Sequence, residues 1–375
     1  MHLIERFISL SVFTLLTGIT LAGVACLRGK QYKIVLLMYW LGLAVLAYFF
    51  IPETTMDLYR LHQSCGNGFC LYSWKQLLYI LPQTSTPAWL LYGWGLFQVF
   101  GQVDWLQTVT WLWGGFNILY IVTHTIDSDN ITHKNRALLL FSVIAIGSFY
   151  SGLMIGLRNI LSFSIILWCF YRETLENKSF LLHLPFYFFA ALLHQAGLVL
   201  VLIRVAFLFS VYKNILVRYV LLCIIGGAFV FLFVHGNFFV DKALDKAYSY
   251  STDPDEYVYY WSMLIAFINQ VQIALILYNY KRKITLCLLH LNPFFYMSLL
   301  LLVISLAALP FSFAIFSRFT LASSLLTVPL LGKLLAPQLH LRNKLLVQSL
   351  WLLGIVIFFL SISRGNLCGY KFFVL

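Results

Sequence analysis

The sequence predicts an all-α integral membrane protein whose helices cross the bilayer many times. Of its 375 residues, 61% are hydrophobic and only 10% are charged. Ordinary soluble domains carry about 25% charged residues, so this chain lacks the polar surface that would cover a core in water. Because each membrane span needs about 20 apolar residues, the composition fits about ten to twelve spans joined by short loops. These observations exclude a soluble enzyme.

Twelve long apolar runs divide the chain, and we expect each to form one transmembrane helix of a single domain over residues 1–375. The first run is longer than the apolar part of a signal peptide and has no small-residue cleavage pattern, so we interpret it as a span. The runs that meet at Arg158 and at His194 have almost no loop between them, which indicates helices that break or turn within the membrane. The runs cover residues 7–27, 34–51, 105–123, 137–153, 157–171, 179–194, 196–212, 217–236, 257–280, 291–309, 318–333 and 346–363.

The distribution of Lys and Arg predicts the orientation. Alternate loops hold fifteen of the twenty-five basic residues, and basic loops remain in the cytoplasm, so both termini are expected outside. The net charge of +12 is then a topology signal and an attraction to anionic lipid headgroups. No basic face with base-stacking aromatic residues lies outside a span, so nucleic acid is not an expected partner. The fifteen are Arg28, Lys30, Lys33, Lys134, Arg136, Arg172, Lys178, Lys213, Arg218, Lys281, Arg282, Lys283, Lys333, Arg342 and Lys344.

Two segments are expected on the outer face. Residues 52–104 contain LYSWKQLLYI and PAWLLYGWGLFQVFGQVDW. If the second stretch were a span, every later loop would move to the other side of the membrane, and the basic loops would lie outside. We therefore interpret it as an amphipathic or re-entrant helix lying on, or dipping into, the outer face. Trp and Tyr suit such an interface because each ring has an apolar body and a polar atom. The second segment, residues 237–256, is a short loop rich in Asp and Lys.

Cys65 and Cys70 share the polar stretch CGNGFC in the first outer segment. A disulfide between them and a pair of free thiols both fit the sequence. The spacing lacks the second Cys/His pair of a structural zinc site, so we expect no metal there.

Ionisable groups gather at the expected outer turns, and this is the main functional signal in the chain. Asp57 and Arg60 follow the second run, Arg158 and His194 occupy abrupt turns, and Arg318 opens the eleventh run. Charges in or near hydrocarbon cost a few kcal/mol, so each is a functional candidate. Structural roles fit as well: the first two would pair with each other, the arginines would anchor the protein at lipid phosphates, and the imidazole would be buried in the core.

One further arginine, Arg204, lies near the middle of the seventh run. A guanidinium at that depth requires a partner. It either pairs with an acid or forms part of the same pocket, and the sequence leaves both open.

Arginines near lipid headgroups suit diphosphate chemistry. Guanidinium forks bind phosphate oxygens and stabilise a diphosphate leaving group without a metal ion. A nearby carboxylate or imidazole takes the proton of an attacking hydroxyl. Arg158 and Arg318, with Asp57 or His194, would compose such a site.

At these residues the chain resembles the bacterial Wzy/EpsG-type polysaccharide polymerases. The resemblance rests on PETTMDLYR, PAWLLYGWGLF, GLRNILSFSIILW and FFAALLHQAGLVLVL, and above all on an arginine at 158 with a histidine 36 residues later. It covers about residues 45–210; beyond them only hydropathy and the SRF of 317–319 agree. CGNGFC is not a feature of the family.

The resemblance implies a metal-independent, cofactor-free glycosyltransferase with a helical, GT-C-like architecture in the bacterial plasma (inner) membrane. It would join oligosaccharide repeat units carried on undecaprenyl diphosphate at the outer, periplasmic face. A chain-length regulator and a flippase would be partners, beside membrane lipid. The site residues would be Asp57 and His194 as catalytic groups, with Arg158, Arg318, Arg60 and Arg204 on the diphosphate or substrate.

Two other classes of function also fit the residues. A lipid-linked oligosaccharide flippase or transporter would also need arginines, but along a central cavity and with repeat symmetry. Another membrane transferase, either a ligase or an acyltransferase, would carry a large late outer loop or a buried catalytic histidine. Because an acyltransferase would use a buried catalytic histidine, His194 keeps the acyltransferase alternative open.

Overall fold

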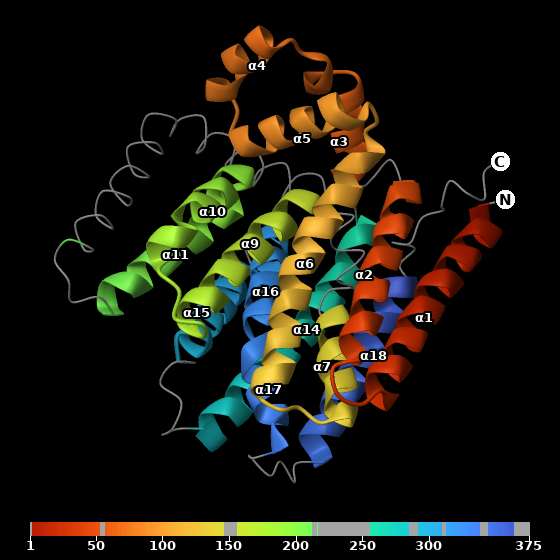
Figure 1. Ribbon diagram of the computed structural model, residues 1–375, viewed down its shortest axis with the longest axis vertical. Coiled ribbons are helices and arrows are strands. Elements are labelled where there is room, and N and C mark those ends of the chain that lie inside the picture. The colour runs from red at the N-terminus through yellow and green to blue at the C-terminus, as the bar shows by residue number, and fades with distance from the viewer. Residues whose placement is uncertain are drawn as a thin grey trace.

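The computed structural model describes residues 2–52, 57–145, 156–211, 216, 256–284, 292–309, 313–337 and 344–363. Within these residues every regular element is a helix, as the composition predicted. Long helices stand side by side in one bundle (Figure 1). The expected span 217–236 and nearly all of the outer loop 237–256 lie outside the described residues.

In the described residues, the other eleven apolar runs coincide with helices of the bundle, the run 137–153 being described only to Ala145. The run 318–333, which we expected to form one helix, forms two. The first extends over Phe313–Leu326, and the second is the short helix Val328–Leu335, with Pro329 in its first turn. The bundle helices are α1 (His2–Cys26), α2 (Tyr32–Phe49), α6 (Asp104–Ser128), α7 (His133–Ala145), α9 (Leu157–Thr174), α10 (Phe180–Leu193), α11 (Gln195–Val211), α14 (Glu256–Ile284), α15 (Asn292–Ala308), α16 (Phe313–Leu326), α17 (Val328–Leu335) and α18 (Lys344–Ser363).

Three helical stretches in the described part of the chain are long and apolar enough to cross a membrane: Tyr32–Phe49, Met263–Arg282 and Ile315–Leu335. Five more apolar helices are 10 to 17 residues long. The outer faces of the bundle are apolar: Ile34 and Met38 of α2 and Leu181 and Phe188 of α10 are each more than 60% exposed. Apolar patches of this extent are unusual on soluble monomers and are typical of a lipid-facing surface.

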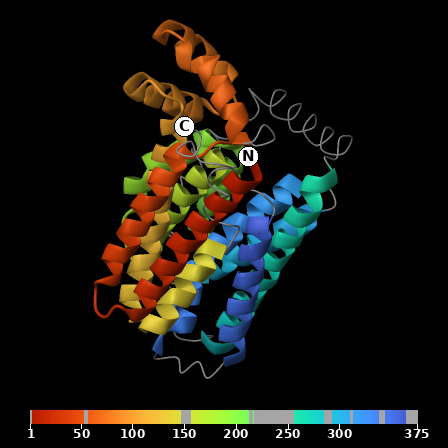
Figure 2. The ribbon, with the colours of Figure 1, turned by 90° about the vertical axis from the view of Figure 1, so that its right-hand side faces the viewer.

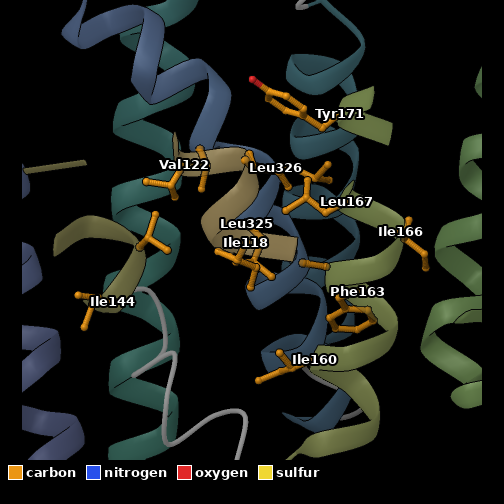
Figure 3. Close-up of a cluster of buried hydrophobic side chains, with 14 of the residues drawn as sticks. Ile118, Val122, Ile144, Ile160, Phe163, Ile166, Leu167, Tyr171, Leu325 and Leu326 are labelled. Carbon is orange, nitrogen blue, oxygen red and sulfur yellow. The ribbon is translucent and has the colours of Figure 1, made fainter. Parts of the chain in front are cut away.

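The centre of the bundle is a continuous apolar core where α6, α7, α9 and α16 meet (Figure 3). Branched and aromatic side chains from all four helices interdigitate there, and burying each of the larger ones contributes about 1.5–3 kcal/mol. The labelled side chains are Ile118, Val122, Ile144, Ile160, Phe163, Ile166, Leu167, Tyr171, Leu325 and Leu326.

One end of the bundle is held by ion pairs between acids at the C-terminal end of α6 and basic residues of neighbouring elements. Asp127 accepts from Lys33 Nζ at 2.5 Å and from the Tyr32 hydroxyl at 2.6 Å. Burial acts to raise the pKa of Asp127, but the hydrogen bonds from Lys33 and Tyr32 outweigh burial and leave the pKa below its ordinary value. Asp129 pairs with Lys333 of α17. This is the end to which the basic loops were assigned.

The opposite end carries a separate group of helices, which we call the cap (residues 57–100). It comprises α3 (Asp57–Gly66), the 3₁₀ turns Phe69–Leu71 and Leu81–Gln83, α4 (Trp74–Ile80) and α5 (Pro87–Phe100). Figures 1 and 2 show the cap projecting beyond the end of the bundle at which α1 begins. The aromatic stretch PAWLLYGWGLFQVF forms α5 and lies across that end.

Cys65 and Cys70 form a disulfide within the cap, which decides between the two alternatives that the sequence left open. Two side chains of α5 fasten this loop: the Trp94 indole donates to the carbonyl of Tyr72 at 2.9 Å, and the Gln98 amide donates to the carbonyl of Cys70 at 2.9 Å. The cap is therefore a small unit with internal bonds of its own.

A buried glutamine of α6 joins the cap to the bundle. The Gln107 amide nitrogen donates to the carbonyls of Ala47 and Phe50 at the end of α2, at 2.9 and 3.2 Å. Its amide oxygen then accepts from His62 Nε2 of α3 at 2.5 Å. The Gln107 amide thus supplies side-chain donors to carbonyls at the end of α2, of which that of Ala47 also accepts from the Phe50 N–H at 3.2 Å.

The crossing of α6 and α17 requires a glycine. A Cβ on Gly332 would overlap Cγ2 of Thr125 and lie 3.2 Å from Asp129 Oδ2. We predict that Gly332→Ala lowers the free energy of unfolding by about 1–3 kcal/mol through overpacking, seen as a lower thermal midpoint in detergent.

The control is Gly18→Ala on the exposed face of α1, where an added Cβ meets nothing within 4 Å. There the better helix propensity of Ala should leave the midpoint unchanged or raise it. Equal losses at both positions would contradict the close approach of α6 and α17.

Candidate functional site

A one-residue break separates α10 from α11, as the sequence around His194 indicated. His194 has extended backbone angles, φ −157° and ψ 141°. Its Nδ1 accepts from the backbone N–H of Ala196 at 3.0 Å, and its carbonyl accepts from the N–H groups of Gly197 and Leu198 at 2.9 and 3.2 Å. His194 is therefore the N-cap of α11, and its side chain is buried.

The neighbouring helix α9 stabilises this break. In an uninterrupted helix the Ala190 carbonyl would accept from the N–H of residue 194. Here it accepts from the Ser162 hydroxyl of α9 at 2.7 Å. A Cβ on Gly197 would overlap Ser162 Oγ and lie 2.7 Å from the Ala190 oxygen, so only glycine lets the three helices approach this closely. Neither Ser162 nor Gly197 was a candidate from the sequence.

Arg158 shares a helix face with Ser162, because the two lie four residues apart at the start of α9. Its side chain is half-buried. The contact between Ser162 and Ala190 thus brings the first turn of α9 to the break at His194. The sequence placed Arg158 and His194 at two separate turns, and the tertiary structure puts those turns side by side.

The other predicted residues lie at the same end of the bundle. Arg318 is half-buried in the first two turns of α16, which packs against α9. Arg60 is exposed on α3 of the cap. Asp57 begins α3, and its side chain lies outside the described part of the structure.

An aromatic stack connects the cap to the helix that ends at His194. Trp89 and Tyr92 of α5 are followed by Trp113 of α6 and Phe189 of α10, with successive ring centroids 5.7, 6.3 and 5.4 Å apart. The Tyr92 hydroxyl is 3.1 Å from the hydroxyl of Thr110. The stack fixes α5 over the end of α10, so the cap covers the neighbourhood of His194.

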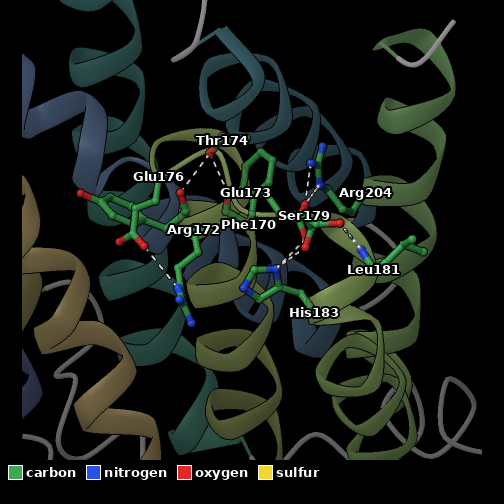
Figure 4. Close-up of polar contacts among 10 residues, drawn as sticks. Phe170, Arg172, Glu173, Thr174, Glu176, Ser179, Leu181, His183 and Arg204 are labelled. Atoms are coloured by element: carbon green, nitrogen blue, oxygen red, sulfur yellow. Dashed lines mark hydrogen bonds and ion pairs between the residues drawn. The ribbon is translucent and has the colours of Figure 1, made fainter. Parts of the chain in front are cut away.

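Arg204 lies in a different part of the bundle from the other candidate residues. Its Nη2 and Nε donate to one oxygen of Glu173 at 2.7 and 3.2 Å, and its guanidinium lies 4.5 Å from the Phe170 ring centroid (Figure 4). His183 Nδ1 donates to the Ser179 carbonyl at 2.9 Å and lies 3.8 Å from Glu173. Of the two alternatives for Arg204, the structure shows the pair with an acid.

This buried cluster is far from Arg158. Glu173 lies in the last turn of α9 and Arg158 in its first, a rise of about 22 Å at 1.5 Å per residue. We therefore remove Arg204 from the candidate site. The sequence missed Glu173 because the charged turn after the fifth run was expected to lie outside the helix, whereas α9 continues to Thr174.

In the described part of the chain, no three His, Cys, Asp or Glu side chains gather as metal ligands would. The positive charge available at the candidate site is that of arginine. The arrangement at the cap end, with Arg158 beside the turn that carries His194, suits an anionic group, because guanidinium N–H groups are donors only.

No protein-family model, curated protein or solved structure matches the chain.

The ion pair of Arg204 gives a test of its structural role. We predict that Arg204→Leu alone lowers the free energy of unfolding by about 3–5 kcal/mol, because it leaves the Glu173 carboxylate buried without its partner. The double variant Arg204→Leu/Glu173→Leu should recover most of that loss. Thermal midpoints of the three variants in detergent measure both effects, and a double variant no more stable than the single one would contradict the prediction.

Proposed function

We propose that this chain is a membrane glycosyltransferase that joins lipid diphosphate-linked oligosaccharide repeat units at the cap end of the bundle. The observation that carries the proposal is the contact between α9 and the α10–α11 break, which brings the half-buried Arg158 to the turn of His194. The family resemblance of residues 45–210 points to the same reaction. The substrate would be an oligosaccharide on undecaprenyl diphosphate.

The reaction needs positive charge at the leaving group and a group that takes one proton. The oxygen of an acceptor sugar hydroxyl forms a bond to the anomeric carbon of the donor chain. The bond between that carbon and the phosphate oxygen breaks, and its electron pair goes to the diphosphate. Arg158 and Arg318 would bind the departing diphosphate, with Arg60 at the edge of the site. A carboxylate, for which Asp57 is the candidate, would take the hydroxyl proton.

Two observations support an outer location for the cap end. The cap holds the disulfide Cys65–Cys70, and disulfides form and persist in oxidising compartments such as the periplasm. The opposite end holds the basic residues Lys33 and Lys333 with their acidic partners, as a cytoplasmic end would. Both fit a bacterial plasma membrane protein whose substrate reaches it on the outer leaflet.

The reaction is tested with purified protein and lipid-linked repeat units, with the products separated on a gel. We expect a ladder of increasing length. Arg158→Ala should lower its formation by about 100-fold or more, because one preorganised cationic donor is lost from the transition state. Lys75→Ala, an exposed change in the cap, is the matched control. Movement of unchanged substrate between leaflets without a ladder would indicate a flippase instead.

The orientation is tested in intact cells with a thiol reagent that does not cross the plasma membrane. Cysteine replaces either Tyr79 of the cap or Lys134 at the other end, both exposed, in a chain in which every cysteine except Cys65 and Cys70 is replaced by alanine. We expect labelling at position 79 from outside and at position 134 only after the membrane is opened. The reverse pattern would place the cap in the cytoplasm.

A further inference from the structure

A buried glutamine lies near the middle of α14, where α14, α15 and α16 pack together. The Gln270 side chain is only 5% exposed. Its amide nitrogen donates to the Ser305 hydroxyl of α15 at 2.5 Å and to the Thr320 hydroxyl of α16 at 2.6 Å. Both of these hydroxyl-bearing residues are buried as well. One neutral amide therefore joins three helices inside the bundle.

Each hydrogen of this contact already has an acceptor. A hydroxyl group carries one hydrogen. That of Ser305 goes to the carbonyl of Leu302 at 2.8 Å, and that of Thr320 goes to the carbonyl of Phe316 at 2.7 Å. Neither hydroxyl has a hydrogen left for Gln270. The amide atom that faces them is therefore the nitrogen, and both of its hydrogens are used.

The amide oxygen of Gln270 remains as an acceptor. It is buried, and no donor in the described part of the chain forms a hydrogen bond with it. An amide oxygen has two lone pairs, and burying it without a donor is unfavourable, most of all in an apolar bundle. The contact between the three helices is thus complete in its donors and one donor short for its acceptors.

This arrangement determines which ligand chemistry fits. An anion would need donors, and those of Gln270, Ser305 and Thr320 are used within the protein. A cation would bring a charge that these three neutral side chains do not balance. A neutral group that donates one hydrogen bond meets the requirement of the amide oxygen, and a hydroxyl is such a group.

We propose that α14, α15 and α16 form a binding site for a hydroxyl group, which donates its hydrogen to Gln270 Oε1. The hydroxyl belongs either to water or to a sugar, and the chemistry of the contact is the same for both. The site uses none of the residues assigned to the proposed transfer reaction, and its existence does not depend on that reaction.

The position of the site makes a sugar hydroxyl a reasonable occupant. Ser305 lies three residues before the end of α15 at Ala308, a rise of about 4.5 Å. Thr320 lies seven residues after the start of α16, a rise of about 10.5 Å, and two residues beyond Arg318. The site is therefore within about two helical turns of the end of the bundle at which Arg318 lies.

The site is tested by the reaction of a buried cysteine with a small hydrophilic methanethiosulfonate. Thr320→Cys and Ala322→Cys are compared in purified protein in which every other cysteine except Cys65 and Cys70 is replaced by alanine. Both positions are buried, and they lie two residues apart on α16. The thiolate is the reactive form, and apolar surroundings disfavour it. We expect labelling about tenfold or more faster at position 320. Equal rates in two folded variants would overturn the proposal.

The role of Gln270 is tested by removing its acceptor. Gln270→Met keeps an unbranched side chain of similar length without the amide, and it should slow the labelling of Thr320→Cys about tenfold. Gln270→Leu gives the same test if the first variant does not fold. Asn279→Leu is the control, because the Asn279 amide lies on the same helix and donates to the carbonyl of Leu275 at 2.8 Å. An unchanged rate in the Gln270 variants would overturn the assignment of that residue.

Lipid-linked repeat units distinguish the two sources of the hydroxyl. If it belongs to a sugar, repeat units should protect Thr320→Cys from labelling, and Gln270→Met should raise their Kd about five- to tenfold through the loss of one hydrogen bond. If it belongs to water, labelling stays fast with repeat units present and the Kd is unchanged. Because the labelling itself is measured without substrate, a wild-type protein that forms no ladder would contradict the polymerase function and leave the hydroxyl site standing.

Discussion

Hydrogen-bond satisfaction inside an apolar bundle is the constraint on which the rest of this structure depends. A backbone carbonyl without a partner costs about 1–3 kcal/mol when buried, and more in hydrocarbon. The chain nevertheless breaks its helices at His194 and ends α2 beside a buried glutamine. In both places a side chain from a neighbouring helix donates to a carbonyl at the helix end: Ser162 to that of Ala190, and Gln107 to those of Ala47 and Phe50.

The two ends of the bundle use charge differently. At the end opposite the cap, Lys33 and Lys333 have acidic partners on α6, so their charges are balanced within the protein. At the cap end the basic residues of the candidate site are the arginines Arg158 and Arg318, half-buried in the first turns of α9 and α16.

The cap explains how a site of this kind is kept from solvent. Its disulfide and the bonds from Trp94 and Gln98 make it a unit, and the ring stack through Tyr92 and Trp113 fixes α5 over the end of α10. The His194 side chain at the end of α10 is buried.

The sequence by itself determined the helical class, which apolar stretches of the described chain form helices, and the interruption at His194, because hydropathy acts locally along the chain. It also indicated which residues would be costly in hydrocarbon. Tertiary structure alone decided their partners. Arg204 is paired with Glu173 because α9 is longer than its apolar run, and Ser162 reaches Ala190 because Gly197 lets three helices approach closely. Such contacts join residues 28 to 31 positions apart, and one sequence carries no local signal for them.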